Sequence, residues 1–132
     1  FVGGKIMGYR SEVAIAIHPD KVSDFLAVLS GCTQAYDLCK GYPDDEYDGM
    51  KSDVFTKGDL FVSLSSIKWY EGYKEIDVID EFIRKVIEDD DEPDKVRFLR
   101  IGEDHQDIQE CGEYAWDDLR IQPASIYCES SL

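Results

Sequence analysis

The segment 102–108 contains the residue types that acid–base chemistry uses. Glu103, Asp104 and His105 are consecutive there, in a polar loop that follows a predicted strand. Loops at strand ends often hold catalytic groups, and carboxylate and imidazole side chains can exchange protons near neutral pH. The same composition is also typical of a hydrated loop, which is the favoured interpretation. These residues are a candidate loop for a small enzyme or a ligand-binding protein.

A second acidic segment partly fits the calcium-binding loop of an EF-hand. With Asp44 as position 1, Glu46, Asp48 and Gly49 take positions 3, 5 and 6 of the loop. Position 12 should be a glutamate that binds calcium through both oxygens, and it is Phe55. An ordinary acidic turn is therefore favoured over a calcium site.

Motifs of the common catalytic and nucleotide-binding classes are missing from the sequence. It has no G-x-S-x-G, no P-loop and no G-x-G-x-x-G. The four cysteines and two histidines include no C-x-x-C and are too widely spaced for zinc. His18, at the end of a predicted strand, is expected to cap a helix or to pack. No catalytic residue, metal ion or cofactor is predicted.

The acidic residues are concentrated in one part of the chain. The formal net charge is -15, yet residues 1–40 are neutral, while residues 71–118 hold 18 acidic and six basic side chains. Such acidity argues against direct binding of nucleic acid, which depends on Lys and Arg. The acidic surface either keeps the chain in solution, which is the favoured interpretation, or attracts a basic partner. In the second case it could mimic DNA and inhibit a host nucleic-acid-binding protein.

Three aromatic residues precede the most acidic helix. Only Lys68 and Lys74 lie close to them, too few for stacking nucleic-acid bases, so packing in the core or at an edge is favoured. A protein-binding surface is the alternative, because Trp and Tyr are enriched in binding hot spots. The candidate partner-binding residues combine these aromatic side chains with acidic side chains that are expected to face solvent: Trp69, Tyr70, Tyr73, Asp77, Glu81, Glu88, Asp89, Asp90 and Asp91.

The apolar pattern predicts the element order β-α-β-β-α-β(-β). The fold class is α+β, with an antiparallel sheet of about four to five strands and two helices on one face in a ferredoxin-like order. The last strand contains Pro123, which favours an edge position or a bulge. The predicted elements are a strand at 12–18, a helix from 19 to 31, a short helix near 36–39, a hairpin of 53–55 with 60–64, a helix at 74–88, and strands at 95–101 and 120–128.

The length predicts one α+β domain over residues 7–132. Met7 is interpreted as the natural start, and residues 1–6 as a non-native or disordered leader. No apolar run approaches the roughly 18 residues of a membrane span, and no secretion signal is visible. The four cysteines are expected to be buried, reduced thiols in a cytoplasmic protein.

Three short motifs resemble small uncharacterised proteins of tailed phages and other mobile elements. They are the start MGYRSEV at 7–13, the segment FLRIGED at 98–104 with the later pair Asp107-Ile108, and KWY at 68–70 before the acidic helix. The resemblance implies an origin in a phage or an integron cassette. It implies no activity and no site residues.

These observations favour a protein that acts by protein–protein interaction without catalysis. The expected partner is a host protein or a second copy of the chain, and a homodimer would form through a sheet edge or the Trp69/Tyr70 region. The alternatives are the acidic DNA mimic and the small enzyme or ligand binder that uses the Glu103-Asp104-His105 loop.

Overall fold

The computed structural model describes residues 8–41, 48–123 and 125–131, so the expected leader and Asp44 and Glu46 of the calcium-like turn lie outside the described residues. The elements are helices, short helical turns and antiparallel strands. They are β1 (Ser11–Ile17), α1 (Pro19–Ser30), α2 (Thr33–Lys40), β2 (Gly49–Ser52), β3 (Leu60–Ile67), α3 (Lys74–Arg84), a π-helical segment (Lys85–Asp89), a 3-10 turn (Pro93–Lys95), β4 (Val96–Gly102), β5 (Ile108–Gly112), β6 (Leu119–Gln122) and β7 (Ser125–Cys128).

The main sheet has five strands in the order β2-β3-β1-β4-β5, and all neighbouring strands are antiparallel. Its first four strands follow the ferredoxin-like order, and β5 is added at the edge beside β4. The predicted α+β class and strand number are confirmed. The described residues form three α-helices rather than two on one face: the third, α2, follows α1 directly and corresponds to the short helix predicted near 36–39.

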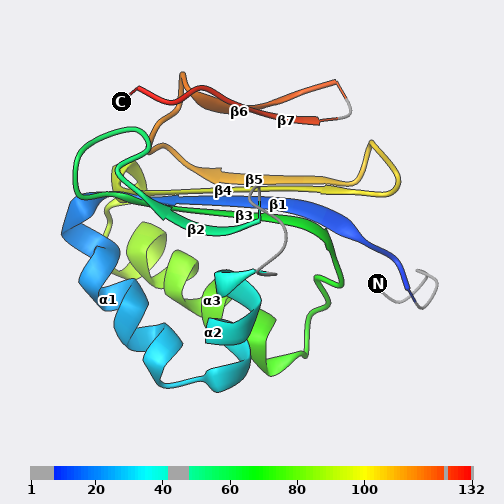
Figure 1. Ribbon diagram of the computed structural model, residues 1–132, viewed down its shortest axis with the longest axis horizontal. Coiled ribbons are helices and arrows are strands. Elements are labelled where there is room, and N and C mark those ends of the chain that lie inside the picture. Colours follow the sequence, from blue (N-terminus) through cyan, green and yellow to red (C-terminus); the bar gives the residue numbers. More distant parts are fainter. Residues whose placement is uncertain (1–7, 42–47, 124, 132) are drawn as a thin grey trace.

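The sheet is covered differently on its two faces (Figure 1). Alternate residues of β1 explain this, because successive side chains of a strand point to opposite faces. Val13, Ile15 and Ile17 pack in the large core under the helices. The smaller Ala14 and Ala16 leave room for a second core beneath the β6–β7 hairpin.

Helix α3 is the element that the apolar spacing predicts best. Ile76, Ile79 and Ile83 are buried on one face, together with Phe82. The helical path continues as a π-helical segment to Asp89, where the backbone N–H of Asp90 donates to the carbonyl of Lys85. The predicted end near 88 is therefore confirmed, although the wider last turn was not predicted.

Two predicted strands are wrong. Residues 120–128 form a hairpin of β6 and β7, with Pro123 in the turn, instead of a single edge strand. Residues 53–55 belong to a turn, and β2 lies earlier, at Gly49–Ser52. The turn is held by the buried Asp59, whose carboxylate accepts hydrogen bonds from three backbone N–H groups, which removes them from strand pairing.

Strand β5 was expected to be part of a loop. Its only large apolar residue is Ile108, which is exposed. An edge strand with little burial on either face leaves no alternating pattern, so only its pairing with β4 defines it.

The cysteines are free thiols, but only two of them are buried. Burial raises the pKa of the Cys39 thiol to about 12, and Cys32 lies in the same core. Cys111 and Cys128 are exposed on β5 and β7, so the expectation that all four are buried is wrong. The strands that carry these two residues lie at the margin of the fold.

Candidate functional site

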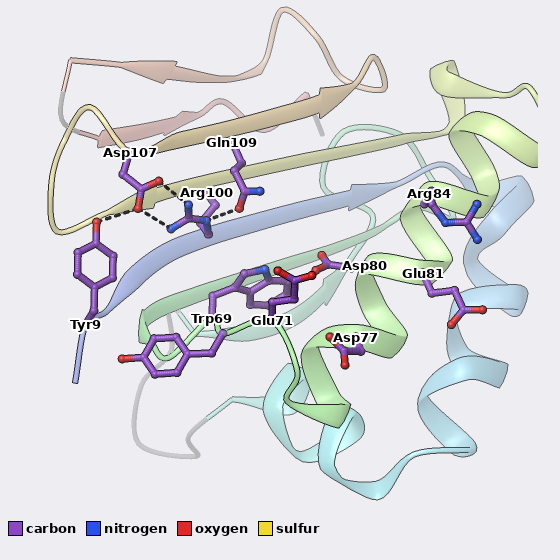
Figure 2. Close-up of a pocket in the computed structure, with 11 residues that line it drawn as sticks. Tyr9, Trp69, Glu71, Asp77, Asp80, Glu81, Arg84, Arg100, Asp107 and Gln109 are labelled. Atoms are coloured by element: carbon purple, nitrogen blue, oxygen red, sulfur yellow. Dashed lines mark hydrogen bonds and ion pairs between the residues drawn. The ribbon is translucent and has the colours of Figure 1, made fainter. Parts of the chain in front are cut away.

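A pocket of about 700 Å³ opens between helix α3, the segment that precedes it, and strands β4 and β5 (Figure 2). We refer to it as the acidic pocket. Carboxylates line its α3 side, and a polar network lines its strand side. The lining residues are Tyr9, Trp69, Tyr70, Glu71, Asp77, Asp80, Glu81, Arg84, Arg100, Asp107 and Gln109.

Arg100 forms the centre of the strand side. It lies on the face of β4 that points toward the helices, where it is buried. Its guanidinium group donates two hydrogen bonds to Asp107, at 2.7 and 3.2 Å, and one to the Ser11 hydroxyl at 2.8 Å. Its Nε–H donates to Gln109. Because these partners use the guanidinium donors, Arg100 does not pair with the carboxylates of α3.

Tyr9 and Gly102 fix this network at the end of β4. The Tyr9 hydroxyl donates to Asp107 at 2.8 Å and accepts from the backbone N–H of Asp104 at 3.1 Å. A Cβ atom at position 102 would overlap the Tyr9 hydroxyl and the Asp107 carboxylate. Glycine at this position therefore permits the close approach that holds Asp107 against Arg100.

The α3 side holds carboxylates without a counter-charge. Asp77 accepts a hydrogen bond from the backbone N–H of Gly72. Within the described part of the chain, no hydrogen bond or ion pair reaches the carboxylates of Glu71, Asp80 or Glu81. The remaining cation of the lining, Arg84, pairs with an aspartate outside the pocket. The acidic pocket therefore carries a negative potential.

Asp80 shows the effect of this crowding. Loss of water in the pocket raises its pKa to about 6, and repulsion from Asp77 and Glu71 adds to the shift. Arg100 opposes the shift only weakly, because its charge is balanced by Asp107. The carboxylate keeps access to solvent, so it can respond to a ligand.

The aromatic residues divide between core and pocket. Trp69 is 8% exposed and packs on Phe98 with a ring-centre distance of 5.5 Å, as the core interpretation predicted. Tyr70 and the exposed Tyr73 form a ring contact at 5.3 Å. Trp69 and Tyr70 line the acidic pocket, whereas Tyr73 does not.

The structure thus separates the nine candidate partner-binding residues. Four of them, Trp69, Tyr70, Asp77 and Glu81, lie together in the acidic pocket. The run from Glu88 to Asp91 follows the opposite end of α3. Asp77 and Glu81 are exposed, as predicted, and they also line the pocket beside β4 and β5.

Part of the acidic run is neutralised by neighbouring cations. Asp90 pairs with Lys85 at 3.0 Å and with Lys21 at 3.2 Å, and these hydrogen bonds lower the pKa of the Asp90 carboxyl. Asp89 pairs with Arg84 at 3.5 Å. The run therefore serves partly to connect α3 to α1.

The Glu103-Asp104-His105 loop lies beside a separate cleft of about 400 Å³. Its carboxylates shape the turn: Glu103 accepts from the backbone N–H of Arg10, and Asp104 accepts from that of Gln106. Among the described residues, 8–41, 48–123 and 125–131, no hydrogen bond joins His105 to either acid. The loop lacks the hydrogen-bonded acid–imidazole pair that proton transfer would use.

Other sequence predictions have structural counterparts. The His18 ring accepts a hydrogen bond from the backbone N–H of Asp20 and caps α1, as predicted. Asp48 of the calcium-like turn accepts from the backbone N–H of Ser65. In the described ranges, no cluster of three or more His, Cys, Asp or Glu suits a metal ion, and no helix is long and apolar enough to cross a membrane.

Sequence reasoning missed the pocket residues Glu71, Asp80, Arg100, Asp107 and Gln109. One signal was available, because Arg100 interrupts a strongly apolar strand at a position that faces the helices. A buried arginine requires an acidic partner nearby. The partner follows seven residues later, across the predicted polar loop, but the pairing of β5 with β4 that brings it back to Arg100 was not predicted.

No protein-family model, curated protein or solved structure matches this chain. The resemblance to phage and mobile-element proteins stays a prediction, and the functional argument depends on the geometry of the acidic pocket.

Proposed function

We propose that this protein acts without catalysis by binding another protein, and that the acidic pocket receives a basic side chain of that partner. The observation that carries the proposal is a set of three carboxylates, Glu71, Asp80 and Glu81, that lie in a concave site and have no counter-charge among the described residues. Loss of water raises the pKa of Asp80, and repulsion from Asp77 and Glu71 adds to the shift; a nearby cation would relieve that repulsion.

The shape and lining of the acidic pocket support arginine or lysine as the bound group. The volume of about 700 Å³ falls within the range of specific ligand sites. Trp69 and Tyr70 add aromatic surface, which attracts guanidinium groups by cation–π contact and stacking. Carboxylates and aromatic rings together favour a side chain with a planar charged group or an apolar stem over a fully hydrated inorganic cation.

The DNA-mimic alternative receives less support. A mimic would present a ridge of free carboxylates, whereas Asp89 and Asp90 are paired with cations of this chain. The partner could still be a basic nucleic-acid-binding protein, because the proposal specifies only a basic side chain. A host origin of the partner follows from the predicted mobile-element origin.

The test is an NMR titration of the whole chain with N-acetyl-arginine methylamide. The neutral control ligand is the citrulline analogue, which has nearly the same shape without the charge. We expect the Trp69 indole signal and the backbone signals of 69–84 to shift with the arginine compound. Trp116 does not line the pocket, so its indole signal should not shift.

A matched pair of variants completes the test. Asp80→Asn should weaken binding and raise the dissociation constant roughly threefold, which is the effect of losing one exposed ion pair. Asp24→Asn removes the same charge from an exposed position on α1 and should leave the constant unchanged. Equal shifts with the arginine and citrulline compounds, or equal weakening by both variants, would overturn the proposal.

A further inference from the structure

Strand β5 forms an open edge of the main sheet. It is last in the strand order, and its residues are exposed or half-buried. An edge strand offers backbone N–H and C=O groups to an additional strand, and protein partners use such edges for recognition. Any binding at this edge would lie directly beside the acidic pocket, which Gln109 of β5 lines.

A second groove, of about 620 Å³, lies between α3 and β5. We refer to it as the apolar groove, because Ile83, Ile87, Phe98 and Ile108 contribute to its lining, with Cys111 at its β5 side. It shares three lining residues with the acidic pocket, namely Asp80, Arg84 and Gln109. The two cavities therefore adjoin along the length of β5.

The register of β5 sets the spacing between the two cavities. Gln109 pairs with Arg100 and Cys111 pairs with Phe98, so both residues belong to the helix side of the sheet. Gln109 lines both cavities, and Cys111 lines only the apolar groove. On an added strand, side chains two residues apart point to the same face and lie about 7 Å from each other.

We propose that β5 binds an extended segment of the partner as a sixth strand of the sheet. The segment carries Arg or Lys opposite Gln109, with its side chain in the acidic pocket. It carries a large apolar residue opposite Cys111, two positions away, with its side chain in the apolar groove. This inference rests on the proposed function and specifies which kind of partner segment the acidic pocket takes.

Charge complementarity selects a basic segment instead of a second copy of β5. The acidic pocket beside β5 and Glu88 of the apolar groove are negative, whereas Glu110 of β5 is paired with Arg97. Two chains that each carry a net charge of -15 would bring like charges together at this edge. A basic segment reverses the sign of this interaction.

The probes are labelled heptapeptides with Ile and Arg two residues apart in a threonine background, TTITRTT and its reverse TTRTITT. Fluorescence anisotropy with the whole chain measures their dissociation constants. We expect one of the two orders to bind at least about tenfold more tightly than a control peptide, TTIRTTT, whose Ile and Arg point to opposite faces. Equal binding of all three peptides would overturn the strand geometry.

Backbone methylation separates strand addition from simple charge binding. Nα-methyl groups at alternate peptide bonds remove the donors on one edge while leaving the side chains intact. The tighter peptide has two methylated forms. The form whose methyl groups replace the N–H donors on the edge facing β5 should bind about tenfold more weakly than the parent. If both forms bind like the parent, strand addition is wrong, while binding of N-acetyl-arginine methylamide would still stand.

Two exposed cysteines provide matched protein variants. Cys111→Arg should abolish peptide binding by filling the apolar groove and adding positive charge, whereas Cys128→Arg on β7 should bind the peptide like the wild type. Light scattering of the unliganded protein tests whether a second copy of the chain pairs with this edge instead. A dimer that Cys111→Arg dissociates and Cys128→Arg does not would show that a second copy fills the edge, and would overturn the basic segment.

Discussion

The two arginines of β4 lie three residues apart and face opposite sides of the sheet, and their surroundings differ. Arg97 is 1% exposed and donates to the carbonyls of Leu119 and Gly112 and to the Glu110 carboxylate. Trp116 covers it, with the guanidinium 4.7 Å from the ring centre. On this side, the network is closed by the hairpin and the segment before it.

Arg100 is also satisfied, but its side of the sheet stays open. Its partners are Asp107, Ser11 and Gln109, and opposite them Asp80 and Glu81 of α3 have no ion-pair partner within the described residues. Two carboxylates show the same contrast. Asp59, near the second core, accepts hydrogen bonds from three backbone N–H groups and from the Tyr114 hydroxyl. Asp80 accepts no hydrogen bond within the described chain. Polar groups that stabilise the fold are fully partnered here, and the carboxylates left over mark the surface available to a ligand.

The two tryptophans provide the largest expected difference between these regions. Trp69→Ala should reduce the free energy of unfolding by about 4 kcal/mol, because it removes a buried ring that packs on Phe98. Trp116→Ala should cost less than about 1 kcal/mol, because this residue is 58% exposed and contacts Arg97 through the face of its ring. Urea unfolding of both variants measures the difference, and equal losses would contradict the assignment of Trp69 to the core.

The aspartates should differ by a smaller amount. Asp59→Ala should cost about 3 kcal/mol, because it leaves several N–H groups and the Tyr114 hydroxyl without their acceptor in a buried turn. Asp80→Ala should leave stability unchanged or increase it, because it removes a carboxylate that is repelled by its neighbours. Urea unfolding at pH 7 compares the two variants. A loss in Asp80→Ala as large as that in Asp59→Ala would show that Asp80 has a structural role.

The smallest effect is a pH dependence that belongs to Asp80. Its pKa is about 6 in the folded protein and near the ordinary value of 3.8 in the unfolded chain. Between these values the folded state binds more protons, so the Asp80 contribution to stability falls as pH rises from about 4 to about 6. Asp80→Asn lacks this loss, so its stability relative to the wild type should increase over the same range.

Urea unfolding of the wild type and Asp80→Asn at several pH values between 4 and 7 measures the difference between their free energies of unfolding. The Asp24→Asn variant, which removes the same charge from an exposed position on α1 outside the pocket, is the matched control. A gap between Asp80→Asn and wild type that stays constant with pH would contradict the raised pKa. Binding of the arginine compound should strengthen over the same range as Asp80 loses its proton.

Local patterns in the sequence were enough for the elements with a buried face. The alternation in β1 and the apolar stripe of α3 both describe side chains that must leave water, so the strand and the helix are visible without their neighbours. The position of the acidic excess in residues 71–118 was also determined by the sequence alone. The sequence also restricted His18 to capping or packing, and the structure shows the cap.

Tertiary structure decided which of those acidic residues remain without a counter-charge. Lys21 reaches Asp90 only because α1 packs near the end of α3, and Asp107 pairs with Arg100 only because β5 folds back on β4. Strand β5 buries too little surface to show a pattern, so pairing with β4 was needed to define it. An ion pair between distant residues depends on the distance between them in space, which composition and periodicity do not contain.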